Sequence, residues 1–461
     1  MFAGDKSLRA GRGRQNMSNT KSDSYWTDHL LRRAGFGTTL QEQSYYRQLG
    51  YDGTLNELLH PESVKDDAME KIVYDQNFDF TDLGDLRRWW IYRMMFSKRP
   101  LVEKITLFWH GHFATSNAGK VNSPYSMYQQ NLTLRNQGLG NFQDLLMSVS
   151  KDPAMIVWLD NQQNTKNKPN ENYAREVMEL FTMGIGNYSE ADVKEAARAF
   201  TGWMAPRDFY FNRKQHDTGE KTFLGEKGNF GGEEIVKILA ARPETARFIS
   251  RKLITFFCMD DPSDGFVQKI ADTFTSSKQD IRTVMQTIFS SNEFRSDKAY
   301  HSKIKSPAEF VIGTMKLLQV DKIDGDLPAV MARMGQNLYE PPNVKGWDGG
   351  MSWIATDTLM ERFNFAARIS TQKFDAKEGY INPTVLASQF GSTSAKDMVD
   401  YFLGRLVDED VPSSARKQLL SYVATNLNGE AVTTMPDAKT LEAKMRGLLH
   451  LIMTLPSYQL V

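Results

Sequence analysis

The stretch that says most about the fold is PLVEKITLFWHGHFATS, residues 100–116. Pro100 stands where a helix can begin, and large side chains then recur every three or four residues, at Leu101, Ile105, Phe108, Trp109 and His112. This spacing predicts an amphipathic helix with His112 on its inward face. On a helix His110 and His112 point roughly 200° apart and cannot share one metal ion, although on a strand they could. His112 is then either a hydrogen-bonded core residue or a functional imidazole.

The same helical periodicity continues along most of the chain, whereas alternating, strand-like runs are scarce. It predicts helices at 82–96, 142–150, 173–183, 193–203, 234–239, 246–257, 267–274, 281–289, 308–318 and 359–369. Aromatic residues in short runs ended by glycines predict a small β-hairpin between Phe209 and Phe230. We therefore expect a mostly α, multi-helical globular protein with a small β-hairpin insertion and a C-terminal helical lobe.

Shifts in composition divide the chain into four predicted parts. Residues 1–24 form a basic head that we expect to be disordered, because basic residues are interspersed there with Gly, Ser and Asn. It also lacks the apolar run of a secretory signal, so a cytoplasmic location is the default expectation. Residues 25–370 form a main helical domain with the polar motifs, 371–384 a polar connector, and 385–461 a C-terminal helical lobe packed on the main domain.

The charge balance and the cysteine content exclude several classes of protein. The 461 residues include 56 Lys+Arg and 56 Asp+Glu, so the chain lacks the basic excess of a general nucleic-acid binder. Cys258 is the single cysteine, which excludes an intrachain disulfide and a multi-cysteine metal site. No apolar run approaches the roughly 18 residues of a membrane-spanning helix. We therefore expect a soluble protein that neither binds nucleic acid nor spans a membrane.

A dense polar motif, NENYAREVMEL, occupies residues 170–180. Helical phase gathers the apolar side chains on one face and leaves Glu171, Arg175, Glu176 and Glu179 on the other. One interpretation is a solvated helix face with an ion pair between Arg175 and Glu179. The other is a polar pocket whose carboxylates hold a hard cation or act as acid and base.

A second polar motif, HDTGEKTFLG at residues 216–225, brings His216, Asp217 and Lys221 within six residues. Asp217 could orient His216, and Lys221 could hold an anion, since loops on a rigid scaffold commonly carry such groups. The alternative is a polar turn at the entry of the predicted hairpin.

Prolines, glycines and tryptophans make up a third motif, EPPNVKGWDGG at residues 340–350, which Trp353 follows. This composition predicts a rigid loop. Its Trp347 and Trp353 either line a ligand site, where they would stack on a sugar ring, or fill the core. The carbohydrate interpretation requires that both side chains keep exposed faces.

The motifs belong to a longer series of segments. Besides residues 100–116 it comprises HLLRRAGFG (29–37), LGNF (139–142), DPAMIVWLD (152–160), NENYAREVMELFTMGIG (170–186), DVKEAARAFTGW (192–203), HDTGEKTFLG (216–225), SRKL (250–253), KSPAEFV (305–311), PPNVKGW (341–347) and LLHLIMTLPSYQL (448–460). In this order they resemble a bacterial family, the domain-of-unknown-function 1800 family, over about residues 25–461. The resemblance implies a helical protein of a frequently exported kind. Such proteins are often encoded beside an uncharacterised, alkaline-phosphatase-like family, whose members are candidate partners.

One functional hypothesis is a hydrolase or group-transfer enzyme acting on a polar or anionic substrate, with the polar motifs converging in one pocket. We then expect Glu176 as general base, His216 as its acid–base partner and Asp217 as the residue that orients His216. Substrate contacts would come from Glu171, Arg175, Lys221 and Trp347, and of these Arg175 and Lys221 would bind an anionic group. A divalent metal is a further possibility, with His112, Glu176 and His216 as its ligands, although no ligand spacing fixes it.

The alternative is a non-catalytic binding or assembly protein that works with an alkaline-phosphatase-like partner. The polar motifs would then form a structural network, and their mutation would lower stability rather than one activity. A third interpretation is a surface protein that holds a carbohydrate-like ligand through its tryptophan loop.

Overall fold

The computed structural model describes residues 21–320, 323, 326–371, 386, 394–408, 410–432 and 437–461. Within these residues the protein is mostly α-helical and has two small antiparallel sheets of two strands each, which confirms the predicted fold class. None of the described helices is both long and apolar enough to cross a membrane. The predicted basic head up to residue 20 and nearly all of the predicted connector lie outside the described residues.

A first apolar core joins the helices of the N-terminal and middle parts of the chain. Its helices are α1 (Asp23–Ala34), α2 (Leu40–Leu59), α5 (Pro100–His112), α6 (Pro124–Gln137), α7 (Phe142–Ser150), α8 (Pro153–Trp158), α9 (Asn172–Glu179), α10 (Glu190–Ala199), α11 (Gly232–Ala241), α12 (Pro243–Phe257), α13 (Asp264–Ser276) and α14 (Ile281–Phe289). Because most of these helices show apolar residues every three or four positions, each buries one stripe against its neighbours.

A second apolar core unites the C-terminal helices with part of the N-terminal half. Its helices are α4 (Leu83–Phe96), α15 (Pro307–Leu317), α16 (Leu327–Arg333), α17 (Thr356–Thr371), α19 (Ala395–Val407), α20 (Ser413–Val423) and α21 (Ala438–Met453). The short α3 (Asp67–Gln76) packs against α4. The helix α5 belongs to both cores, since Leu107 lies in the second core and its neighbour Phe108 in the first.

The sheets lie close to the predicted hairpin. Strand β3 (Lys221–Phe223) pairs with β4 (Glu226–Gly228), inside the predicted range. Strand β2 (Tyr210–Phe211) pairs instead with β1 (Trp203–Met204). The predicted helix at 193–203 is therefore wrong at its end: α10 stops at Ala199, and Gly202 adopts a positive φ of 81° that leads into β1.

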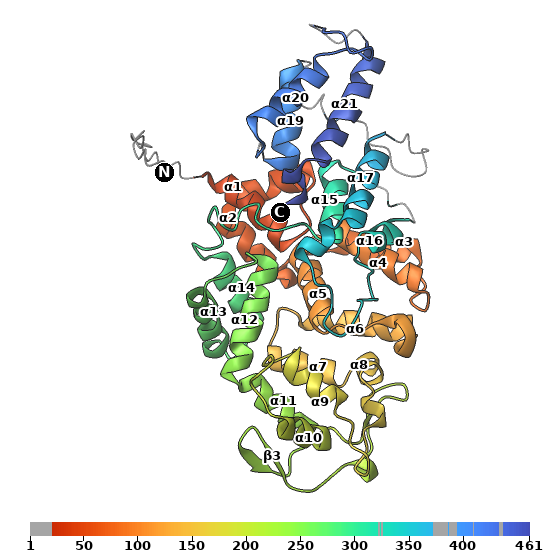
Figure 1. Cartoon of the computed structure of the whole chain (residues 1–461), viewed down its shortest axis with the longest axis vertical. Coiled ribbons are helices and arrows are strands. Elements are labelled where there is room, and N and C mark those ends of the chain that lie inside the picture. The colour runs from red at the N-terminus through yellow and green to blue at the C-terminus, as the bar shows by residue number, and fades with distance from the viewer. Residues whose placement is uncertain are drawn as a thin grey trace, which may run out of the picture.

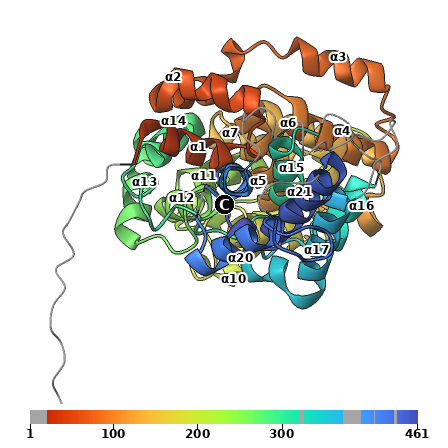
Figure 2. The same ribbon diagram turned by 90° about the horizontal axis from the view of Figure 1, so that it is seen from above.

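The helices are arranged along one long axis (Figure 1). In that view α7 to α11 and β3 form the lower part, α19 to α21 form the upper end, and α5 lies between them. From above, α2 and α3 line one edge, and α17 and α20 lie toward the opposite edge (Figure 2). The chain end returns to the middle, where the Val461 N–H donates to the Lys303 carbonyl (2.8 Å) and the Lys305 N–H to the Gln459 carbonyl (2.8 Å). The C-terminus thus fixes the segment that leads into α15.

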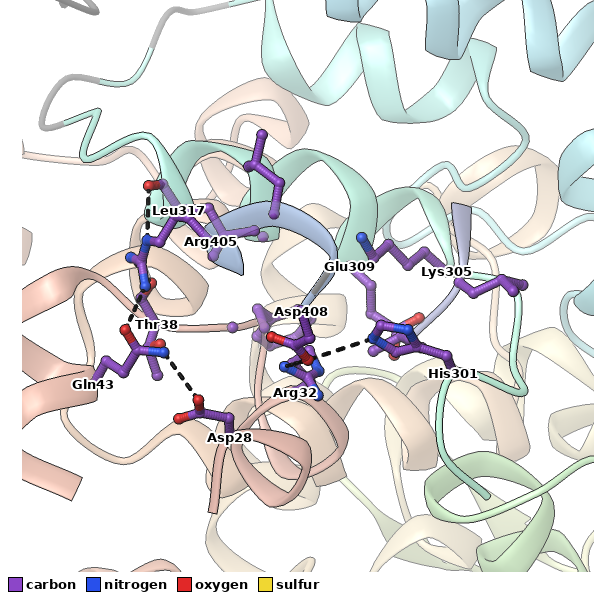
Figure 3. A pocket seen from close by; sticks show the side chains of 16 residues that line it. Asp28, Arg32, Thr38, Gln43, His301, Lys305, Glu309, Leu317, Arg405 and Asp408 are labelled. Atoms are coloured by element: carbon purple, nitrogen blue, oxygen red, sulfur yellow. Dashed lines mark hydrogen bonds and ion pairs between the residues drawn. The ribbon is translucent and has the colours of Figure 1, made fainter. Parts of the chain in front are cut away.

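The end of α19 lies against α1 and α15, and a small polar cavity of about 40 Å³ remains between them (Figure 3). Arg32 of α1 forms an ion pair with Asp408 at 2.6 Å, and the Tyr300 hydroxyl donates to the same carboxylate at 2.6 Å. Although burial opposes it, Arg32 lowers the pKa of Asp408 below its ordinary value. These contacts attach the C-terminal helices to the N-terminal ones, while the predicted division at residues 371–384 stays a prediction.

Candidate functional site

The two histidines of residues 100–116 lie in the last turn of α5, and both are buried. His110 accepts a hydrogen bond at Nε2 from the Tyr339 N–H (3.2 Å), so it holds the chain just before the tryptophan loop. His112 contacts Lys252 of α12 and the carbonyl of Phe181 instead. The prediction that the two imidazoles diverge on a helix is confirmed.

The partners of His112 determine which of its nitrogens carries the proton. Nε2 lies 3.1 Å from the Phe181 carbonyl oxygen, which can only accept a hydrogen bond, so we assign the proton to Nε2. Nδ1 then presents a lone pair to the Lys252 Nζ, 3.4 Å away. Burial and the charge of Lys252 lower the pKa of His112 well below its ordinary value, which keeps the ring neutral.

A cavity of about 490 Å³ opens beside His112. We call it the lysine pocket. It lies where the two cores meet, because its lining includes residues of α5 and α12 and of the segment entering α15. Its main lining residues are Leu107, Phe108, Gly111, His112, Phe248, Arg251, Lys252, Thr255, Phe256, Lys303, Ile304, Ser306, Glu309, Lys345, Trp347, Asp348 and Trp353.

Four segments that carry the family resemblance meet around the lysine pocket. They are residues 100–116, 250–253, 305–311 and 341–347, which are far apart in the sequence. Pockets at the junction of packed units, with apolar walls and a few polar groups, are the usual form of small-molecule sites. The convergence therefore makes this cavity the candidate functional site.

Close backbone packing places the tryptophan loop on α5. Gly346 adopts a positive φ of 90°, and a Cβ there would lie 2.3 Å from the Gly111 carbonyl oxygen. Only glycine fits this approach, which seats Trp347 against Gly111 and brings its ring to 5.5 Å from that of His110. Trp347 and Trp353 are both half-buried, so the loop does not seal them in the core.

Most charged side chains around the lysine pocket already have a partner of opposite charge. The pairs are Arg251 with Asp264, Lys303 with Asp260, Lys345 with Asp348, and Glu309 with Lys104. The pair of Lys345 and Asp348 is exposed, so it is weak and open to exchange with a ligand.

Lys252 differs from these groups. No carboxylate of the described residues pairs with it, and its Nζ lies 5.3 Å from the centre of the Phe248 ring. Burial, with a smaller contribution from the charge of Lys345, lowers the pKa of Lys252 to about 8. The amine is thus a cation in an aromatic environment, next to a neutral imidazole.

The polar motif at 170–180 lies on the outer face of α9. Arg175 forms an ion pair with Glu190 at 2.6 Å and a longer one with Glu171 at 3.3 Å, and all three are at least partly exposed. The predicted partner Glu179 instead accepts from the Tyr188 hydroxyl at 2.7 Å. Glu176 is half-buried, and burial together with Glu179 raises its pKa. None of these side chains lines the lysine pocket; the motif reaches it only through the Phe181 carbonyl on His112.

The groups of the 216–221 motif are held by structural hydrogen bonds. Asp217 pairs with Arg198 through both carboxylate oxygens, at 2.7 and 3.2 Å, and this pairing lowers the pKa of Asp217. His216 donates through Nδ1 to the Thr201 carbonyl at 2.9 Å, so Asp217 does not orient it in this structure. Lys221 is buried and donates to the carbonyls of Asp217 (2.6 Å) and Gly219 (3.0 Å).

The predicted metal ligands do not come together. In the part of the chain that the structure describes, no group of three or more His, Cys, Asp or Glu side chains is arranged to hold a metal ion. His112 faces Lys252 and Phe181, His216 faces Thr201, and Glu176 lies on the outer face of α9. Their roles as ligands, and the catalytic roles given to Glu176, His216 and Asp217, stay predictions.

Of the residues predicted to form the site, His112 and Trp347 reach the lysine pocket. The residue that sequence reasoning missed is Lys252, together with its neighbours Phe248 and Phe256 on α12. A signal was present, since Lys252 belongs to the SRKL segment at 250–253. Its pattern on α12 is otherwise that of an ordinary amphipathic helix.

The family whose description reads "Protein of unknown function (DUF1800)" matches residues 29–460. The chain belongs to this family, which confirms the resemblance seen in the sequence. No curated protein and no solved structure matches the chain.

Proposed function

We propose that this DUF1800 protein is a hydrolase or group-transfer enzyme whose substrate binds in the lysine pocket. The substrate we propose is an anionic molecule with a ring or another flat apolar face. The observation that carries this proposal is Lys252, a cation that no described carboxylate neutralises, in a cavity with aromatic walls. A negative group on the substrate would supply the missing counter-charge.

The lining of the lysine pocket offers contacts both for the ring and for the negative group of the proposed substrate. Trp347 and Trp353 offer half-buried aromatic faces, on which a sugar or an aromatic ring could stack. Lys345 lies close enough to lower the pKa of Lys252, so two cations favour an anion at this end of the cavity. His112 provides a neutral imidazole for proton transfer beside Lys252.

Binding of small probes tests the proposal. Tryptophan fluorescence would follow titration with phenyllactate and glucuronate, each compared with an uncharged counterpart, phenyllactamide or methyl glucoside. We expect saturable binding of at least one anion and, because one charge-assisted contact contributes about 1.5–3 kcal/mol, a roughly ten- to hundredfold weaker affinity in Lys252→Met. The matched control is Lys237→Met, which changes an exposed lysine on α11. The proposal fails if neither anion binds, or if Lys252→Met binds as tightly as the native protein.

The two anionic probes show whether the ring of the substrate is a sugar or an aromatic ring. Preference for glucuronate would support the carbohydrate-like ligand, and preference for phenyllactate an aromatic acid. Replacing Trp353 by alanine should lower the affinity for whichever ligand binds, since stacking of a ring on tryptophan contributes about 1 kcal/mol.

A second candidate is the non-catalytic assembly protein with an alkaline-phosphatase-like partner. One observation favours it for part of the chain. The side chains of Asp217, His216 and Lys221 are hydrogen-bonded to Arg198 and to backbone carbonyls, as a structural network requires. Asp217→Asn should then lower the thermal midpoint and leave probe binding in the lysine pocket unchanged. A selective loss of binding at full stability would count against this role.

A further inference from the structure

The amine of Lys252 has the surroundings of a nucleophile rather than of a structural cation. Structural lysines of this protein bind fixed acceptors: Lys221 donates to two carbonyls, and Lys104 to Glu309 and the Gly35 carbonyl. Within the described residues Lys252 has one polar contact, the His112 Nδ1 at 3.4 Å. Lys252 lines the lysine pocket, whose volume of about 490 Å³ admits a ligand of substantial size.

We infer that Lys252 is a catalytic nucleophile that forms an imine with an aldehyde or ketone group of the substrate. The inference deepens the proposed function and rests on the lysine pocket being the substrate site. It also favours the group-transfer alternative, because an imine activates the carbon next to the former carbonyl. Because the pocket is also lined by Lys345, whose exposed ion pair can be exchanged for a ligand, the substrate class is an oxo acid that carries an apolar or ring-shaped substituent.

The step balances without any further reactant. The Nζ lone pair attacks the carbonyl carbon, and the π electrons of the C=O bond move to the oxygen, which gives a carbinolamine. The C–O bond then breaks as the C=N bond forms, and the oxygen leaves as water with the two protons that the amine has lost. One water is released, and nothing is oxidised or reduced.

His112 is placed to move these protons. Because Nε2 donates to the Phe181 carbonyl, the Nδ1 lone pair is directed at Lys252. Nδ1 can therefore take a proton from the attacking nitrogen and return it to the leaving oxygen. The ring is held in this tautomer by a backbone group that no side-chain rotation removes.

The protonation state of the amine supports the same role. A pKa of about 8 leaves roughly a tenth of the Lys252 amine neutral near pH 7, a few hundred times more than for an ordinary lysine. An aromatic pocket that removes the amine from water and a nearby charge, here that of Lys345, are the two conditions that commonly activate a lysine.

Reductive trapping tests the inference on the full chain. The protein is mixed with phenylpyruvate, which has a ring, a carboxylate and a ketone, and with cyanoborohydride, which converts an imine into a stable secondary amine. Intact mass and peptide mapping then locate the adduct. We expect one adduct, on Lys252, formed at least about tenfold faster than any adduct on the exposed Lys237 and absent from Lys252→Met. The rate of imine formation, followed by quenching timed samples with excess borohydride, should rise with pH to a plateau, with its midpoint near the Lys252 pKa of about 8.

His112→Gln provides a readout that a structural role would not move. It should slow trapping several-fold near neutral pH and much less at alkaline pH, where solvent hydroxide can take the proton from the attacking nitrogen in place of His112. Equal labelling of Lys252 and Lys237, or an undiminished adduct in Lys252→Met, would overturn the inference. If phenyllactate binds but phenylpyruvate is not trapped, the nucleophile is refuted and the proposed binding site stands. If neither phenyllactate nor glucuronate binds, the proposed function itself has failed.

Discussion

Replacing Lys252 by methionine is expected to stabilise the free protein, although it removes the residue on which the proposed function depends. Methionine keeps an unbranched, flexible side chain for contact with Phe248 and removes the charge. The physical reason is that a half-buried ammonium without a carboxylate has lost part of its hydration and gained no ion pair in return. Active sites commonly store such unfavourable groups.

The pKa of Lys252 gives the size and the sign of the effect. The difference between the ordinary lysine value of 10.5 and the value of about 8 corresponds to an upper bound of roughly 3 kcal/mol. Solvent screening at this partly exposed site and the lost contact with His112 reduce the expected gain to about 1–2 kcal/mol. Because folding lowers the pKa, the penalty is complete below pH 8 and disappears as the pH rises toward 10.5.

Thermal unfolding followed by circular dichroism, at about pH 7 and again near pH 10, measures the prediction. Lys252→Met should unfold a few degrees higher than the native protein at the lower pH, and the difference should shrink at the higher pH. The contrasting variant is Lys221→Met, which should be less stable at both values, because it leaves two carbonyls near a buried site without their donor. A Lys252→Met protein that is less stable than the native one near neutral pH would refute the reasoning.

Three further predictions concern the frame of the site. Gly346→Ala should detach the tryptophan loop from α5 and shift the tryptophan emission to the red. The control Gly429→Ala has a similar φ of 83° but no atom in contact, so it should leave the emission unchanged, and equal spectra of the two variants would contradict the prediction. Burial raises the pKa of Asp152 to about 7, so its carboxylate destabilises the fold as the pH rises from about 4 to 7. Asp152→Asn, which can still accept from Met155 and Gln130, should be more stable above pH 7 by up to about 4 kcal/mol in urea unfolding, and an unchanged pH dependence would exclude this origin. Asp408→Asn should cost about 3–5 kcal/mol and speed hydrogen exchange in α1 and α19, and Asp410→Asn, at an exposed carboxylate, should do neither.

Helical periodicity predicted the fold well where helices are regular. The predicted segments 142–150 and 281–289 coincide with α7 and α14. Helix ends were predicted less well, because they depend on local backbone geometry. The segment 173–183 extends beyond α9, which ends at Glu179, since the N–H groups of Met183 and Gly184 both turn back to the Met178 carbonyl.

The candidate site was predicted only in part. Helical phase was sufficient to place His112 inward, because that depends on the spacing within one helix. The surroundings of the 216–221 motif were harder to predict, since Asp217 pairs with Arg198, a residue outside the motif. A dense group of polar residues in a sequence is therefore as typical of a hydrogen-bonded turn as of a functional site.

Lys252 could not be identified from the sequence because its distinguishing property, that no carboxylate of the described residues pairs with it, is visible only in three dimensions. Its position also explains how the fold tolerates it. An unpaired ammonium inside either core would cost several kcal/mol in effective desolvation, on the order that abolishes marginal stability. Where the two cores meet, with Leu107 in one core and Phe108 in the other, the amine keeps access to solvent through the lysine pocket. Under the proposed function, a substrate would displace that solvent without disturbing either core, so the junction that lets the fold tolerate the lysine would also leave its amine open to reaction.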